Sequence, residues 1–206
     1  MEITDHKFNL DALGQTSKLL QTNPEYYTIW NHRRLILQHL FSKNNDRREL
    51  EDEDSRNVPL IAELISNDLD FLLPLLRQFP KCYWIWKYRQ WLLDEATRLL
   101  PVWDALGFWQ RELGLVGKML SLDNRNFHGW GYRGKVITAL ENAQLRLMGE
   151  GTSMTEEEFQ YTTKMIESNL SNFSAWHTRS KLIPRLLDER KADEATREGF
   201  LDSGML

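Results

Sequence analysis

"NPEYYTIWNHRRLIL" at residues 23–37 decides the fold, because three later segments repeat its pattern. These segments are "FPKCYWIWKYRQ" (79–90), "DNRNFHGWGYRG" (123–134) and "NLSNFSAWHTRS" (169–180). Numbered from a tryptophan at position 0, each copy has an aromatic residue at −3 and an arginine at +3. The aromatic residues are Tyr27, Tyr83, Phe127 and Phe173, the tryptophans Trp30, Trp86, Trp130 and Trp176, and the arginines Arg33, Arg89, Arg133 and Arg179. A recurrence at intervals of about 50 residues is typical of stacked supersecondary repeats.

The spacing within each copy predicts an α-helix with positions −3, 0 and +3 on one face. An apolar residue continues that face in every copy: Leu37, Leu93, Ile137 and Ile183. Asn23, Asp123 and Asn169 are expected to cap three of these helices, with Pro24 and Pro80 at first helical positions.

A second amphipathic segment precedes each copy, at residues 10–22, 58–78, 108–122 and 155–169. Pro74 is expected to kink or split the second of these, and Thr155 and Glu158 have the spacing of a capping box. Each repeat is therefore predicted to be a helical hairpin. Because neighbouring hairpins bury faces that one alone cannot, the fold class is all-α, a tetratricopeptide-like α-solenoid.

Residues 1–206 are predicted to form one solenoid domain with repeats at about 10–41, 58–100, 108–147 and 155–190. Between them, 42–57 is expected to be an acidic, polar insertion and 148–154 a flexible loop containing two glycines. The segment 94–107 is apolar enough to pack, but Pro101 interrupts it.

Composition limits the function. A hydrophobic fraction of 41% and an aromatic fraction of 11% suit a folded chain, and a net charge of −4 without a basic stripe argues against nucleic-acid binding. The sequence contains no apolar run that could span a membrane and no signal-peptide pattern at its start. With one cysteine, Cys82, a reducing and cytoplasmic setting is the simplest expectation.

The repeated tryptophans are interpreted as packing residues of the hairpins. The +3 arginines could lie along the indoles, bind carbonyls at a helix end of the next hairpin, or face a partner or an anionic ligand. Cys82 is expected to be an ordinary helix residue. The five histidines lack metal-ligand spacing, so no metal site is predicted in the chain.

The repeat resembles the α-subunit of the protein prenyltransferases, most clearly in "RELGLVGKMLSLDNRNFHGWGYR" (111–133) and "NLSNFSAWHTRSKLIPRLL" (169–187). These stretches are more similar to the Rab-type (type II) geranylgeranyltransferase than to the subunit shared by farnesyltransferase and the type I enzyme. The resemblance implies a heterodimer whose β-subunit holds zinc and most of the isoprenoid pocket. That enzyme transfers geranylgeranyl from its diphosphate to C-terminal cysteines of Rab GTPases presented by an escort protein.

The resemblance also implies roles for particular residues. Lys81 in "PKCYWIW" matches the family lysine that reaches the diphosphate, which makes it the candidate catalytic residue. Tyr83, Asn126 and His128 resemble neighbouring substrate-binding positions. The other repeats carry Glu25, Arg125 and Ser171 where the second has Lys81, so this lysine is no part of the shared pattern.

The family's α-subunits contain more repeats than these four, and an incomplete chain is one expectation from the sequence. Two other functions remain open: a non-catalytic interaction scaffold, and the α-subunit of farnesyltransferase or the type I enzyme.

Overall fold

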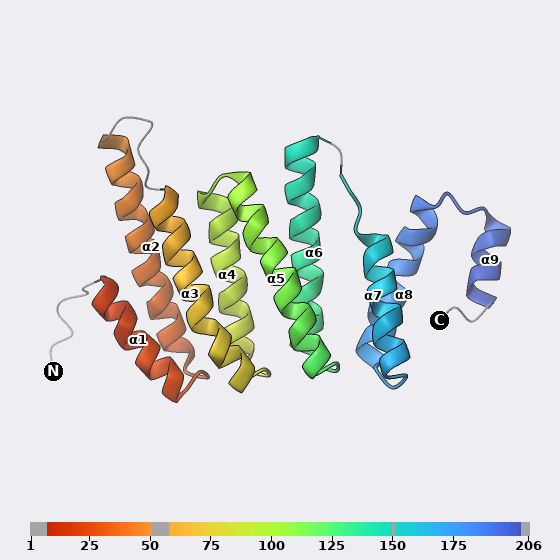
Figure 1. The fold of residues 1–206 in the computed structure, drawn as a ribbon, viewed down its shortest axis with the longest axis horizontal. Coiled ribbons are helices and arrows are strands. Elements are labelled where there is room, and N and C mark those ends of the chain that lie inside the picture. The colour runs from red at the N-terminus through yellow and green to blue at the C-terminus, as the bar shows by residue number, and fades with distance from the viewer. Residues whose placement is uncertain (1–7, 51–57, 150, 203–206) are drawn as a thin grey trace. The chain divides into compact units, whose positions relative to one another are not determined.

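The computed structural model describes residues 8–50, 58–149 and 151–202, which are helical over most of their length and contain no strand (Figure 1). The predicted fold class is confirmed: the chain is an all-α protein built from helical hairpin repeats, as in an α-solenoid. The helices among these residues are α1 (Leu10–Thr22), α2 (Tyr27–Leu50), α3 (Val58–Gln78), α4 (Tyr83–Leu99), α5 (Val102–Leu122), α6 (Phe127–Met148), α7 (Thr155–Ser168), α8 (Phe173–Glu189) and α9 (Glu194–Asp202).

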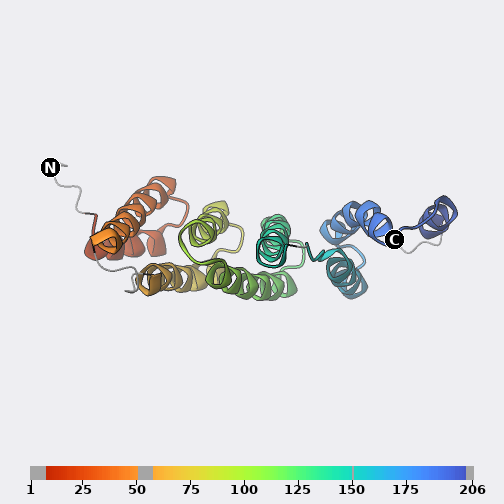
Figure 2. The ribbon, with the colours of Figure 1, turned by 90° about the horizontal axis from the view of Figure 1, so that it is seen from above.

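The chain divides into two compact units, residues 1–108 and 109–206, with the boundary inside α5. In the first unit, α1 pairs with α2 and α3 with α4. In the second, α7 pairs with α8, and α6 also contacts α8. Within each unit the second helices of the hairpins form one layer, α2 with α4 and α6 with α8 (Figure 2). The first helices α3 and α7 lie on the other side of their units.

The second helices begin three residues later than predicted. Asn23 and Asn169 are the C-caps of α1 and α7, and their side-chain oxygens accept a hydrogen bond from the backbone two residues on, at 3.0 Å. The N-caps of α6 and α8 are instead Asn126 and Asn172, whose side chains accept from Gly129 N and Ala175 N at 3.1 Å. The predicted caps Asn23, Asp123 and Asn169 were wrong, because asparagine and aspartate suit a tight turn as well as a helix start.

The prolines also differ from expectation. Pro74 lies inside a continuous α3 at an exposed position and does not split it. Pro24 and Pro80 belong to turns between helices, and Pro101 separates α4 from α5. Residues 42–50, predicted as the first part of a polar insertion, continue α2, whereas 51–57 lie outside the described residues.

Each repeated tryptophan ties its helix to the preceding turn. Trp30, Trp86 and Trp130 are at most 7% exposed, and Trp176 is half-buried. Every indole N–H donates to the backbone carbonyl six residues earlier, at 2.7–2.9 Å. A buried indole N–H needs a hydrogen-bond acceptor, and all four repeats supply the same one, a backbone carbonyl of the preceding turn.

The repeated arginines are buried, and three of them bind the first helix of their own hairpin. Arg33, Arg89 and Arg179 each donate from Nη1 to the carbonyl twenty residues earlier, at 2.8, 2.9 and 3.3 Å. Arg33 and Arg179 also bind hydroxyl groups on that helix, at 2.6 Å to Thr16 and Thr163. The predicted bond to a helix end of the next hairpin was wrong, because these carbonyls lie within a helix of the same repeat.

Buried carboxylates join one hairpin to the next. Arg33 Nε donates to Asp68 Oδ1 at 3.0 Å, and Tyr88 donates its hydroxyl to Asp68 Oδ2 at 2.8 Å. In the second unit, Arg133 Nε donates to Glu158 Oε2 at 2.8 Å. Glu158 therefore pairs with an arginine and does not form the predicted capping box.

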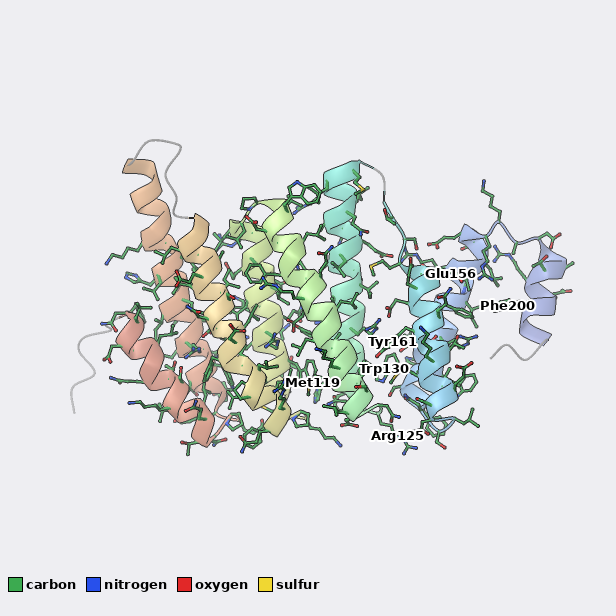
Figure 3. All side chains as sticks on the ribbon, in the orientation of Figure 1. Met119, Arg125, Trp130, Glu156, Tyr161 and Phe200 are labelled. Atoms are coloured by element: carbon green, nitrogen blue, oxygen red, sulfur yellow. The ribbon has the colours of Figure 1, made fainter. Side chains whose placement is uncertain are left out.

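The contact between α6 and α7 is also aromatic. Figure 3 shows Trp130 on α6 and Tyr161 on α7 lying side by side, with ring centroids 5.8 Å apart. The Arg133 guanidinium lies 3.5 Å from the centroid of the Tyr161 ring, so the arginine both pairs and stacks. At the end of this unit, Phe200 of α9 packs on Phe159 and the cluster around it.

Replacing Asp68 with alanine tests the buried junction. The change leaves Arg33 and Tyr88 without their acceptor in a dry environment, so we expect the free energy of unfolding to fall by about 3–5 kcal/mol. Urea denaturation followed by circular dichroism measures it. The matched control is Asp70→Ala, an exposed carboxylate on the same helix, which should change stability by no more than about 0.5 kcal/mol. Equal losses of stability in the two variants would contradict a stabilising role of Asp68 between the hairpins.

Candidate functional site at the hairpin turns

Lys81 lies on the turn between α3 and α4, two residues before α4 begins, and its side chain is exposed. The turn is closed by a hydrogen bond from Cys82 N to Phe79 O at 3.0 Å. The first turn of a helix presents backbone N–H groups and a partial positive charge. An ammonium group on this turn therefore adds to a positive field that favours an anion.

Cys82 fastens this turn to the turn before α2. Its side chain is buried, and its thiol donates a hydrogen bond to Pro24 O at 3.5 Å. The same carbonyl accepts the indole N–H of Trp30 at 2.7 Å. Burial raises the pKa of the Cys82 thiol to about 11, so it is protonated at neutral pH. Cys82 was predicted to be an ordinary helix residue, but it is the N-cap residue directly before α4.

Three aromatic side chains lie at the starts of α2 and α4, and α4 begins two residues after Lys81. Tyr83 is 48% exposed, and its ring centroid lies 5.2 Å from that of Trp84. Trp84 lies 5.7 Å from Tyr27, the residue at −3 in the first repeat. This part of the first unit combines a lysine with three aromatic side chains at the start of two helices.

The −3 aromatic residues are exposed in all four repeats and not packed with the tryptophan: Tyr27 54%, Tyr83 48%, Phe127 68% and Phe173 81%. In a helix, positions −3 and +3 lie about 60° to either side of position 0. When the arginine at +3 turns toward the first helix, the −3 side chain turns outward. The expectation that the three positions share one buried face was therefore wrong for the aromatic residue.

The remaining candidates lie in the second unit. Asn126 is 3% exposed, and its side-chain oxygen caps α6. His128 is half-buried, and its ring centroid lies 3.9 Å from that of Phe127. The structure thus brings Lys81 together with Tyr83, and Asn126 with His128, each pair within its own unit. A substrate contact for Tyr83, Asn126 or His128 stays a prediction.

Within the described ranges 8–50, 58–149 and 151–202, no group of three His, Cys, Asp or Glu side chains could hold a metal ion. The same described helices include none long and apolar enough to cross a membrane.

Comparison with known families decides the identity of the repeat. The protein prenyltransferase alpha subunit repeat matches residues 10–40, 65–96, 109–140 and 155–186, each range inside one predicted repeat. The chain belongs to the protein prenyltransferase α-subunit repeat family. The resemblance read from the tryptophan and arginine pattern is thereby confirmed.

Three relatives of this prenyltransferase α-subunit repeat protein share the name geranylgeranyl transferase type-2 subunit alpha. The Candida albicans protein is 42% identical over 196 residues, which cover 90% of this chain and 48% of the relative. The Saccharomyces cerevisiae protein is 38% identical over 92% of this chain and 50% of its own length. The Homo sapiens protein is 36% identical over 85% of this chain and 25% of its own length. The chain spans about half the length of the two fungal relatives.

Sequence reasoning missed the buried acids of the prenyltransferase repeat. Asp68, Glu112 and Glu158 each stand eighteen residues before a repeat tryptophan, and all are at most 5% exposed. Tyr88 and Tyr132, both at +2, donate their hydroxyls to Asp68 and Glu112 at 2.8 Å. An alignment of the repeats extended to their first helices would have shown both positions.

Asn126 tests whether a predicted binding residue has a structural role. Asn126→Ala removes the cap of α6, so the free energy of unfolding should fall by about 1 kcal/mol. Asn126→Ser retains a capping oxygen and should restore most of that loss. Thermal and urea unfolding of both variants provide the measurement. If alanine costs no stability, the capping role is wrong.

Proposed function

We propose that the chain acts as the α-subunit of a heterodimeric Rab-type geranylgeranyltransferase. The observation that supports this most is the 42% identity to a geranylgeranyl transferase type-2 subunit alpha over 90% of the chain. The reaction would transfer geranylgeranyl from geranylgeranyl diphosphate to C-terminal cysteines of Rab GTPases in the cytoplasm. A Rab escort protein would present the acceptor.

The proposed partner is a prenyltransferase β-subunit, which would supply the zinc and most of the isoprenoid pocket. Zinc activates the acceptor cysteine as a thiolate when it is bound there. The chain described here would be inactive alone. Its contribution would be a rigid turn surface that carries Lys81 and the rings near it.

Lys81 has a definite task in this proposal. Negative charge grows on the departing diphosphate as its bond to the isoprenoid carbon breaks, and an ammonium group stabilises that charge. The bonds from Cys82 and Trp30 to Pro24 O fix the turn on which the lysine stands. A fixed backbone lets the positive charge meet the transition state without first having to be ordered.

Reconstitution tests the proposed function. The chain is co-expressed with a prenyltransferase β-subunit, and the complex is assayed with geranylgeranyl diphosphate, a Rab GTPase and its escort protein. Recovery of a one-to-one complex that prenylates the Rab only with the escort protein supports the proposal. Failure to bind a β-subunit at micromolar concentration would favour a non-catalytic scaffold. Escort-free prenylation of a short CaaX peptide would favour the farnesyltransferase or type I enzyme.

Lys81→Ala should lower kcat of the reconstituted enzyme by about 10- to 1000-fold, because one charge-stabilising group is lost. Assembly with the β-subunit should not change, since Lys81 is an exposed turn residue. Lys87→Ala, six residues later in the chain and within α4, provides the control and should retain turnover. Steady-state kinetics and gel filtration measure the two effects. Unchanged kcat in Lys81→Ala would remove this lysine from the reaction.

A further inference from the structure

Two consecutive arginines on α2 have opposite environments. Arg33 turns inward and is paired with the buried Asp68. Arg34 is half-buried, and no carboxylate of the described residues pairs with it. Its Nε is buried without a hydrogen-bond partner among those residues, and Nη1 makes only a long contact with Asn31 Oδ1 at 3.4 Å. Arg34 therefore carries the same positive charge as Arg33 but has no carboxylate to neutralise it among the described residues.

Two aromatic rings of α4 hold the Arg34 guanidinium. Its central carbon lies 5.6 Å from the ring centroid of Tyr88 and 5.6 Å from that of Trp91. The two rings are themselves in contact, with centroids 5.3 Å apart. A guanidinium fixed against aromatic faces has lost part of its freedom before any ligand arrives, which lowers the entropy cost of binding.

Arg34 is no part of the repeat pattern. The residue at +4 is Gln90, Gly134 or Ser180 in the other three copies. Packing of the hairpins therefore does not require a cation at this position. The partial burial that Arg34 accepts is unfavourable for its charge, and this desolvation lowers its pKa. A carboxylate brought against the exposed edge of the guanidinium would compensate that loss.

The surroundings favour an acidic protein surface as the occupant. Residues 27–45 of α2 and 83–93 of α4 contain arginine, lysine and histidine but no aspartate or glutamate. Leu35, next to Arg34, is 52% exposed, and Tyr83 on α4 is 48% exposed. Arginine flanked by aromatic and apolar side chains is the usual composition of an energetic centre in a protein interface. A small phosphate-like anion would need several converging hydrogen-bond donors, whereas Arg34 offers one guanidinium group. An acidic side chain of a protein therefore fits this position better.

We propose that Arg34, held between Tyr88 and Trp91, docks a carboxylate of the partner subunit onto the α2–α4 surface. The proposal rests on the proposed function, because it takes the prenyltransferase β-subunit as the partner. It adds an acidic contact point on that partner, complementary to residues 27–45 and 83–93, which contain cations but no acid.

Titration of the β-subunit into the full chain tests the proposal. Dissociation constants are measured by calorimetry for the wild type and for Arg34→Ala, Arg34→Lys and Arg34→Glu, at about 50 and 300 mM salt. We expect Arg34→Ala to weaken binding by about 10-fold or more and Arg34→Glu by more than that. Arg34→Lys should be intermediate, because an ammonium keeps the charge but cannot stack as a planar fork. The difference between wild type and alanine variant should shrink at the higher salt concentration.

Lys18→Ala is the matched control, since Lys18 is an exposed cation of the same unit on α1, outside the α2–α4 surface, and it should bind like the wild type. Melting temperatures of the wild type and Arg34→Ala should differ by no more than about 4 °C, because Arg34 has no carboxylate partner among the described residues and loses only its contacts with the Tyr88 and Trp91 rings. Binding of Arg34→Ala within about 2-fold of the wild type would overturn the proposal while leaving the heterodimer intact. A higher KM for geranylgeranyl diphosphate at unchanged subunit affinity would assign Arg34 to a small anion and also overturn it. If the wild-type chain binds no β-subunit, the proposed function fails first, and the docking proposal fails with it.

Discussion

A buried arginine three residues after each tryptophan is the interaction on which the hairpins depend. A guanidinium carries five N–H donors and cannot lose its charge, so burial is tolerable only if its surroundings supply acceptors on several sides. Arg33 finds them in a backbone carbonyl and two hydroxyls of α1 and in Asp68 of α3. One side chain therefore fixes the pairing within a hairpin and the position of the next hairpin. The small hydroxyl residues of the first helices and the acid eighteen residues before the tryptophan follow from that requirement.

Much of this arrangement could be predicted from the sequence. The helical hairpins follow from apolar spacing and from the repetition of three positions, and residues 10–22 and 58–78 are helices with the predicted bounds. The turns could not be predicted in the same way. An asparagine that caps a helix and one that closes an Asx turn are the same residue, and only the distances to Glu25 N and Leu19 O distinguish them for Asn23. The pairing of Arg33 with Asp68 joins residues far apart in the chain, so spacing within one copy does not reveal it.

The candidate site was predictable to a lesser degree. Lys81 was singled out through the resemblance to the prenyltransferase α-subunits, and its contact with the diphosphate stays a prediction. The structure shows that its side chain is exposed on the turn before α4. Asn126 shows the limit of the same reasoning, because the structure gives its side chain a backbone N–H of its own helix to bind. A residue type that suits a substrate contact also suits a helix start, and only burial and a hydrogen-bond partner distinguish the two roles.

The repeated positions and the exceptional ones are physically connected at Pro24. Its carbonyl accepts the indole of Trp30, a residue of the repeat pattern, and the thiol of Cys82, which no other copy has. The packing of the first repeat thus sets where the turn before α4 lies, and that turn carries Lys81. Arg34 has a similar relation to the pattern, since Tyr88 stacks beneath it while donating to Asp68, the acceptor of Arg33. Lys81 and Arg34 do not belong to the repeat pattern, but residues of the packed repeat hold the backbone or the side chain at each place. The packing that builds the fold therefore also orients these two cationic residues.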